Sequence, residues 1–248
     1  MNRRLILSSL VVFMIVAATA YLVADVNGLT QRGGHFPTSV GIKYVWAANN
    51  ADVPVTISFT GPWDFTTGPK DVTLVSEIVQ KTTAYNYANY PLATFALKES
   101  GGGRPTLYRF FRKANNGIVW YGVSSPTSAD DTYTLSTAIR RLFFPAKLNV
   151  MITQRTNLIY PGETVPLTLQ LRYVGQGALT VGAGTFNDTV MLQTKASMGG
   201  SAPRSYIVYN WFAPYLGMVA QITSLDGETN EQFTTASQFE WLKTASVP

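Results

Sequence analysis

The chain has 248 residues, of which 13% are charged and 12% aromatic, and its formal net charge is +5 at pH 7. A chain this apolar can bury a core, which excludes disorder, and it lacks the clustered Lys/Arg residues of nucleic-acid-binding proteins. It has no cysteine, which excludes disulfides, thiolate metal sites and a cysteine nucleophile.

The first 24 residues are predicted to send the chain into or across a membrane. Arg3 and Arg4 precede an uncharged run from Leu5 to Ala24, and export machinery keeps such a positive end inside. Because the run has no polar face, it does not suit a buried helix of a globular domain. Export without disulfides is common in bacterial envelopes, so we predict a prokaryotic protein on the periplasmic or extracytoplasmic face of the cytoplasmic membrane.

Two fates of this segment, residues 1–24, stay open. Ala18-Thr19-Ala20 and Leu22-Val23-Ala24 resemble signal-peptide cleavage sites, which favours removal. The length favours a retained single-pass anchor, because the run at about 1.5 Å per residue covers the roughly 30 Å hydrocarbon core. In either case residues 5–24 contact the membrane at least transiently.

The rest of the chain is predicted to be a tether followed by a β domain. Residues 25–37 contain Asn27-Gly28 and Gly33-Gly34 and form the tether. Residues 38–248 form the β domain. A turn-like stretch at 126–131 divides it into two candidate lobes, at about 38–125 and 132–248.

Alternation of apolar and polar residues predicts strands along most of this domain. It is clearest from Val165 to Tyr173, where every second residue is apolar. The other predicted strands are 40–47, 53–59, 72–78, 106–113, 117–123, 147–153, 186–195, 205–212 and 217–224. Helical signal is sparse: 136–144 is predicted as a short helix, while 76–82 and 229–242 are ambiguous. The predicted fold is mainly β, a curved antiparallel sheet (half-barrel or sandwich-like) with few short helices, plus an N-terminal hydrophobic helix.

Glycines mark the predicted connections. Asn115-Asn116-Gly117 predicts a hairpin, and Gly175-Gln176-Gly177 predicts a turn. Gly101-Gly102-Gly103-Arg104 lacks the Lys-Ser/Thr and the helix that a phosphate-binding loop requires, so we predict a hairpin there too. Trp63-Asp64-Phe65, between two Gly-Pro pairs, predicts a loop that carries an aromatic anchor.

No catalytic, cofactor-binding or metal-binding residue is nominated, and we expect no cofactor. His35 is the only histidine and lies in the tether, without partners for a triad or a metal site. Asp130-Asp131 is interpreted as a solvated turn. The acids around Gly227 (Asp226, Glu228 and Glu231) lack the spacing of a calcium-binding EF-hand.

The many aromatic residues are the remaining candidate for a site. Strands favour aromatic side chains in their core, but a surplus could line a cavity for an apolar ligand or form a sugar-stacking face. The residues concerned are Tyr85, Tyr87, Tyr90, Phe95, Tyr108, Phe110, Phe111, Trp120 and Tyr121.

Two segments resemble an uncharacterised family of bacterial exported or lipoprotein-like envelope proteins. Residues 182–190 (GAGTFNDTV) and 209–219 (YNWFAPYLGMV) are similar to the family's C-terminal "AGTF…W(Y/F)AP-x-x-G" motif, with Tyr215 in place of a usual Gly. Phe36-Pro37, followed by Gly41, Tyr44 and Trp46, resembles its opening. The resemblance implies an envelope location and a fold similar to lipoprotein-carrier half-barrels. The motif itself suits a folding role, in which Gly184 permits a turn and Trp211 and Phe212 take opposite faces of a strand.

The leading functional hypothesis is a non-catalytic envelope protein that binds a protein partner or an apolar ligand. An alternative is an accessory subunit of a membrane complex, held by an uncleaved anchor. A second alternative is a hydrolase of envelope polymers, which would need two carboxylates about 5–10 Å apart across a cleft.

Overall fold

The computed structural model describes residues 38–114, 117–143, 147–213 and 216–246. The predicted leader and tether, with His35 and Phe36-Pro37, lie outside these ranges. The division of the β domain into two lobes stays a prediction. Within the described ranges, helical structure consists of three single-turn 3-10 helices, Lys81–Thr83, Tyr87–Asn89 and Ala129–Asp131. None of the helices found there has the length and apolarity needed to cross a membrane.

Fourteen strands account for most of the described chain. They are β1 (Lys43–Ala48), β2 (Val53–Pro54), β3 (Trp63–Asp64), β4 (Val72–Gln80), β5 (Phe95–Gly101), β6 (Arg104–Ala114), β7 (Gly117–Ser124), β8 (Tyr133–Phe143), β9 (Ile152–Tyr160), β10 (Glu163–Val181), β11 (Gly184–Met198), β12 (Arg204–Ala213), β13 (Gly217–Ser224) and β14 (Thr235–Ser246).

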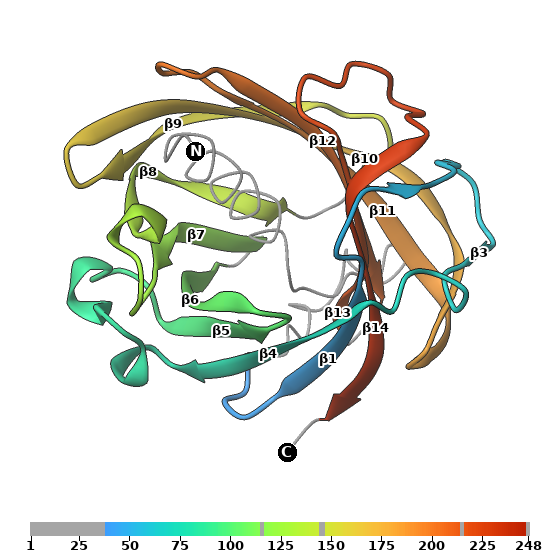
Figure 1. Cartoon of the computed structure of the whole chain (residues 1–248), viewed down its shortest axis with the longest axis horizontal. Helices are drawn as coiled ribbons and strands as arrows, with labels where there is room; N and C mark the ends of the chain where they lie inside the picture. The colour runs from blue at the N-terminus through green and yellow to red at the C-terminus, as the bar shows by residue number, and fades with distance from the viewer. Residues whose placement is uncertain (1–37, 115–116, 144–146, 214–215, 247–248) are drawn as a thin grey trace.

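Twelve of these strands, β1 and β4 to β14, form a closed antiparallel barrel (Figure 1). Each strand pairs with the next in the chain, and β1 pairs with both β4 and β14, which closes the ring. The predicted mainly β, curved antiparallel sheet is confirmed. The sheet curves further than the half-barrel we expected, because the C-terminal strand binds the first strand and leaves no open edge there.

An outer segment, residues 49–71, covers the barrel wall from outside. It contains β2 and β3, and β3 pairs with β10 in parallel while lying outside the ring (Figure 1). The rings of Trp63 and Phe65 meet that of Trp211 edge-on, at centroid distances of 6.1 and 4.9 Å. Phe65 also meets Phe239 at 5.1 Å. The predicted aromatic anchor is therefore present, and it packs on β12 and β14, the strands on either side of β13.

Glycines within β10 make room for this outer segment. A Cβ on Gly175 would lie 2.2 Å from the Phe59 carbonyl oxygen, and one on Gly177 would lie 2.9 Å from the Gly61 Cα. The prediction of a turn at 175–177 is wrong, because β10 continues through it with two bulges. These glycines serve close backbone approach rather than chain reversal.

Four other segments differ from the prediction. The predicted strand at 53–59 is wrong beyond Pro54, where β2 ends. The predicted helix at 136–144 is wrong, since β8 runs from Tyr133 to Phe143. The predicted strand at 147–153 is displaced, because β9 begins at Ile152. β5 was missed altogether, and the ambiguous 229–242 region becomes a loop followed by β14. β4 ends at Gln80, so the ambiguous 76–82 region is strand followed by a 3-10 turn.

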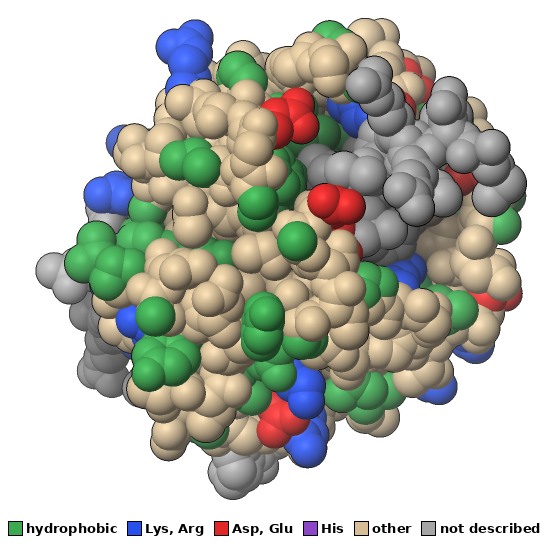
Figure 2. All heavy atoms as spheres, turned by 60° about the vertical axis from the view of Figure 1, so that its left-hand side comes forward, with side chains coloured by type: hydrophobic (Ala, Val, Ile, Leu, Met, Phe, Trp, Pro, Cys, Tyr) green, Lys and Arg blue, Asp and Glu red, His purple; other side chains and the backbone are tan. Residues whose placement is uncertain are grey.

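Most of the aromatic residues singled out in the sequence are buried. Phe95, Phe111 and Trp120 belong to the main core, while Tyr90 stacks on Phe110 at 3.9 Å in a smaller core. Tyr108 and Tyr121 are half-buried against that smaller core, and Tyr85 and Tyr87 are exposed. Figure 2 shows that hydrophobic side chains on one face of the molecule form separate patches rather than one continuous surface.

Candidate functional site

The inner wall of the barrel carries polar side chains on most strands. Side chains alternate between the two faces of a strand, so the pairing register shows which residues share the inner wall. On one side of the barrel, Ser76 of β4 lies opposite Glu99 of β5. On the other side, Gln221 of β13 lies between Asn210 of β12 and Glu240 of β14. We call this set the inner polar belt: Ser76, Glu99, Arg104, Arg109, Tyr133, Tyr160, Thr194, Asn210, Gln221, Thr223, Gln238 and Glu240.

Two ion pairs hold the charged members of the inner polar belt. Arg109 Nε donates to Glu99 Oε2 at 2.6 Å, and the Arg109 side chain is 1% exposed. Arg104 Nη1 donates to Glu240 Oε1 at 2.9 Å. The same Oε1 accepts a hydrogen bond from the Gln238 amide. Because β5, β4 and β1 separate β6 from β14, the Arg104–Glu240 pair spans part of the barrel interior.

Burial dominates the electrostatics of these groups. The pKa of Glu99 is raised, chiefly by burial, although its contacts with Arg109 lower it; the nearby charge of Glu240 also raises it. Burial also lowers the pKa of Arg141 to about 9, so this residue stays positive at neutral pH. Its guanidinium lies 5.2 Å from the centroid of the Trp120 ring, which stabilises the cation.

Several buried polar atoms at this wall have no hydrogen-bond partner in the described part of the chain. They are Asp131 Oδ2, Tyr133 OH, Tyr160 OH, Thr194 Oγ1, Asn210 Oδ1 and Thr223 Oγ1. Each such atom costs about 1–3 kcal/mol relative to its solvated state. Native proteins keep few of these groups, and an ordered water or a ligand is one way in which they are satisfied.

The far end of the inner wall is apolar and aromatic. It includes Phe95, Phe111, Phe143 and Phe212. The ring of Trp120 lies between this end and Tyr133, which it meets edge-on at 5.8 Å. A pocket of about 430 Å³ lies at this end of β4, β5 and β6. It is lined by Thr38, Val40, Gln80, Lys81, Thr82, Thr94, Phe95 and Lys113.

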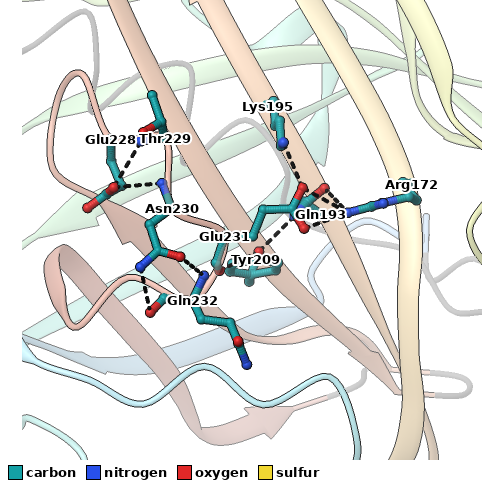
Figure 3. Close-up of polar contacts among 9 residues, drawn as sticks. All are labelled: Arg172, Gln193, Lys195, Tyr209, Glu228, Thr229, Asn230, Glu231 and Gln232. Atoms are coloured by element: carbon teal, nitrogen blue, oxygen red, sulfur yellow. Dashed lines mark hydrogen bonds and ion pairs between the residues drawn. The ribbon is translucent and has the colours of Figure 1, made fainter.

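A second polar cluster lies on the outside of the barrel and secures the loop between β13 and β14 (Figure 3). Glu231 accepts hydrogen bonds from Arg172 Nη2, at 3.0 and 2.9 Å, and its Oε1 lies 2.7 Å from Lys195 Nζ. Tyr209 OH donates to the Glu231 backbone oxygen at 2.8 Å and accepts from Gln193 Nε2 at 2.7 Å. We call this cluster the outer latch, because its contacts hold the loop against the barrel wall.

The acids considered for calcium are engaged elsewhere. Glu231 belongs to the latch, and Glu228 Oε1 accepts from the backbone N–H groups of Thr229 and Asn230 (Figure 3). Asp226 accepts from the Ser205 N–H. In the described ranges, no group of three or more His, Cys, Asp or Glu side chains could hold a metal ion.

The structure changes the interpretation of two other candidate segments. The interpretation of Asp130-Asp131 as a solvated turn is wrong for Asp131, which is 1% exposed and whose pKa is raised by burial. The predicted hairpin at 101–104 is confirmed, since Gly102 and Gly103 have positive φ angles of 60° and 71° between paired Gly101 and Arg104. This turn positions Arg104 at the end of the barrel.

Two solved structures are similar to this one. One is a candidate lipoprotein from Parabacteroides distasonis ATCC 8503, with 11% sequence identity and a TM-score of 0.50; the match covers 86% of this chain and 99% of that one. The other is a candidate exported protein with a YmcC-like fold from Bacteroides fragilis NCTC 9343, with 13% identity and a TM-score of 0.50; the match covers 87% and 100%. The chain shares the fold of both proteins. No protein-family model and no curated protein matches its sequence.

The segments of the family resemblance have structural positions in this fold. Gly184 begins β11 directly after the 182–183 turn, with a φ of 132°. Trp211 packs outward against the outer segment, while Phe212 faces inward, and both are buried. These positions agree with a folding role for the motif, whereas membership of the family stays a prediction.

Proposed function

We propose that this chain is a non-catalytic protein of the bacterial cell envelope that binds a ligand inside its barrel. The observation that carries the proposal is the set of buried polar atoms without partners on the inner wall. Such atoms destabilise an empty protein, so a ligand that satisfies them gains affinity by relieving that cost.

The size of the barrel supports an internal ligand. About eight strands give an interior that side chains fill or that holds one small ligand, and the interior widens with strand number. A twelve-stranded barrel is wider than an eight-stranded one, which supports an internal ligand. The apolar end suits the apolar ligand expected from the sequence, but the inner polar belt adds hydrogen-bonding groups that a purely apolar ligand would leave unsatisfied.

The carboxylates of the belt favour binding over hydrolysis. Glu99 and Glu240 are close enough to influence one another, as a pair of catalytic acids would be. However, Arg109 binds Glu99 and Arg104 binds Glu240, so each carboxylate presents an oxygen to an arginine rather than to a substrate. We propose that these two ion pairs have a structural role and fix the positions of the side chains on the inner wall.

An envelope location is supported by the leader and by the nature of the similar proteins. Arg3-Arg4 and the apolar run predict export, and one of the proteins of the same fold is a candidate exported protein while the other is a candidate lipoprotein. An accessory subunit held by an uncleaved anchor is the second candidate, favoured by the length of residues 5–24. A mature N-terminus at Tyr21 or Asp25 would remove that anchor.

Native mass spectrometry of the protein purified from its own membrane tests the proposal. We expect a retained small molecule, released on unfolding, and the same experiment reports the mature N-terminus and any protein partner. A protein that carries no small molecule would contradict internal ligand binding. Recovery of cleaved polymer fragments after incubation with cell-wall material would instead support the hydrolase.

A further inference from the structure

The pocket at the ends of β4, β5 and β6 is built on three neighbouring strands of the barrel (Figure 1). Gln80, the last residue of β4, pairs with Phe95, the first residue of β5, and Phe95 pairs with Phe111 of β6. Residues two apart in a strand share a face, so Lys113 lies on the same inner face as Phe111. Phe95 is a buried core residue and forms the apolar floor of the pocket.

Two lysines line this pocket from either side of β5. Lys81 follows the last residue of β4, and Lys113 is the second-last residue of β6. Neighbouring strands lie about 4.8 Å apart, so the backbones that carry the two lysines are about 10 Å apart across β5. A lysine side chain is a flexible four-carbon stem, and both ammonium groups can therefore reach one ligand group that lies between them.

Hydrogen-bond donors surround the two ammonium groups. Lys81 Nζ donates to the Pro91 carbonyl at 3.1 Å, which fixes this ammonium beside the pocket and leaves two of its three N–H donors for a ligand. The Gln80 amide and three threonine hydroxyls add further donors: Thr38, Thr82 and Thr94. Unlike the buried atoms of the inner polar belt, these side chains are at least partly exposed, so a ligand can reach them by displacing water.

The charge of the pocket favours an anion. Among the described residues, neither Asp nor Glu lines it. Glu99, further along β5, is bound by Arg109. A concave site lined by charges of one sign concentrates ions of the opposite sign, so Lys81 and Lys113 attract a negatively charged group into the pocket.

The number of donors favours a phosphate over a carboxylate. A phosphate monoester carries a charge of about −1.5 to −2 at pH 7 and three strong acceptor oxygens, which match two ammonium groups and several hydroxyls. A carboxylate carries one negative charge and two oxygens. Lysine binds phosphate groups widely, as a point charge. Val40, which is exposed in the pocket wall, and Phe95 offer apolar surface to the organic part of such an ester.

We propose that the pocket between Lys81 and Lys113 binds the phosphate group of a phosphate monoester. This inference goes beyond the proposed function, because the site lies at the end of the barrel and does not use the inner polar belt. A soluble phosphate ester and the phosphate headgroup of a membrane lipid share this chemistry. Thr38 of the pocket follows the predicted tether, residues 25–37, which spans at most about 45 Å, so a retained anchor would hold the pocket within reach of lipid headgroups.

Isothermal titration calorimetry of the full chain in a nonionic detergent tests the inference. The probe is glycerol 3-phosphate, and glycerol is its uncharged counterpart. We expect saturable binding of glycerol 3-phosphate, no binding of glycerol, and weaker binding of the phosphate at pH 5 than at pH 7.5, because the phosphate loses its second charge near pH 6. Failure of glycerol 3-phosphate to bind, or equal binding of glycerol, would overturn the inference.

Two lysine variants locate the binding. We expect Lys81→Gln and Lys113→Gln each to weaken the binding of glycerol 3-phosphate about tenfold. Lys98→Gln is the matched control, because Lys98 lies on the outer face of the same strand β5 and should leave the affinity unchanged. Thermal unfolding checks that each variant is folded. Lys113 is exposed, so its variant should fold even if loss of the Lys81–Pro91 contact destabilises the other. Equal affinities in all three variants would refute the site.

Mixed micelles distinguish the two sources of phosphate. The titration is repeated with phosphatidic acid, which has a phosphate monoester headgroup, or with phosphatidylcholine, whose headgroup is a diester balanced by choline. Loss of glycerol 3-phosphate binding with phosphatidic acid alone identifies a lipid headgroup, and unchanged binding identifies a soluble ester; both results support the inference. Because the retained internal ligand is detected separately by native mass spectrometry, failure here leaves the proposed function standing.

Discussion

Arg104 Nη1 lies 2.9 Å from Glu240 Oε1, although three strands separate the two residues around the barrel. The tight turn at Gly102-Gly103 places Arg104 at the start of β6, and Glu240 is a buried residue of β14. The pair therefore joins two parts of the wall that the backbone ladder does not connect directly. An ion pair inside the barrel also distinguishes this interior from the apolar core of a lipoprotein carrier, which the sequence led us to expect.

Breaking this pair should destabilise the protein. Arg104→Met leaves the Glu240 carboxylate buried beside Gln238 without its cation, and we expect a loss of about 2–3 kcal/mol, somewhat below the usual range because Arg104 is partly exposed. Urea unfolding measures the loss. Lys43→Met, which removes the exposed Lys43–Glu77 pair, should change stability by less than about 1 kcal/mol. Equal effects would show that Arg104–Glu240 behaves as a surface pair.

The raised pKa of Glu99 predicts the sign of a pH dependence. Burial raises the pKa of the folded state above its ordinary value of 4.5, so the folded protein binds the proton more tightly than the unfolded chain. The stability of the wild type relative to Glu99→Gln should be greatest below pH 4.5 and should fall as pH rises through the folded pKa. Urea unfolding of both proteins across this range checks it, and a relative stability that rises with pH would contradict burial as the cause.

The outer latch should show the opposite pH dependence. Lys195 and Arg172 hold the pKa of Glu231 below its ordinary value, so the latch stabilises the loop above that value and weakens as pH falls through the folded pKa. Glu231→Gln should loosen residues 225–234 at neutral pH while the barrel stays folded. Hydrogen exchange followed by mass spectrometry reports this directly. Glu228→Gln, which alters only contacts within the loop, is the control.

The regular strands could be predicted because their inner and outer faces differ in the expected way. β13 was predicted with its observed bounds, 217–224. β5 was missed because its inward positions include Glu99, whose charge matches no apolar alternation. β8 was mistaken for a helix because a bulge offsets its pairing: Val119 pairs with Arg140 and Ile118 with Leu142. Arg141 is thus the extra residue, and Ile139, Leu142 and Phe143 acquire a helix-like spacing.

The candidate site could not be predicted from the sequence, because its polar residues also face inward from strands. Charged and amide residues within strands are normally assigned to the solvent face, yet Arg109 and Asn210 face inward. Only the closure of the barrel, through the pairing of β1 with β14, shows which face of each strand is enclosed. The aromatic surplus did indicate a site, but it did not indicate the polar partners.

The close contact between Gly175 of β10 and the outer segment predicts that adding a single methyl group at this position lowers the stability of the fold. Gly175→Ala places a Cβ against the Phe59 carbonyl, so the outer segment must move away from the wall, and we expect a loss of about 1–3 kcal/mol. Gly199→Ala is the matched control, because a Cβ there meets only Pro166 at an ordinary 3.4 Å. Urea unfolding compares the two, and a loss confined to Gly199→Ala would contradict the packing of residues 59–61 on β10.

The contact between β8 and β9 predicts a local weakness. Between these two strands, only Thr134–Ile159 and Leu135–Leu158 pair through their backbones. Further along, side chains of β9 make hydrogen bonds to the backbone of β8 in place of backbone pairing. Thr156 Oγ1 accepts from the Thr137 N–H at 3.1 Å and donates to the Thr137 carbonyl at 2.7 Å.

Replacing the Thr156 hydroxyl should weaken the contact between β8 and β9. Thr156→Val leaves both backbone groups of Thr137 without partners, and we expect a loss of about 1–3 kcal/mol with faster hydrogen exchange at residues 136–140. Thr153→Val, at an exposed position of the same strand, should change neither. Because this contact borders Tyr133 and Tyr160, we also expect the variant to release its retained ligand faster. Unchanged exchange in Thr156→Val would show that the backbone ladder extends further along β8 than the two observed pairs.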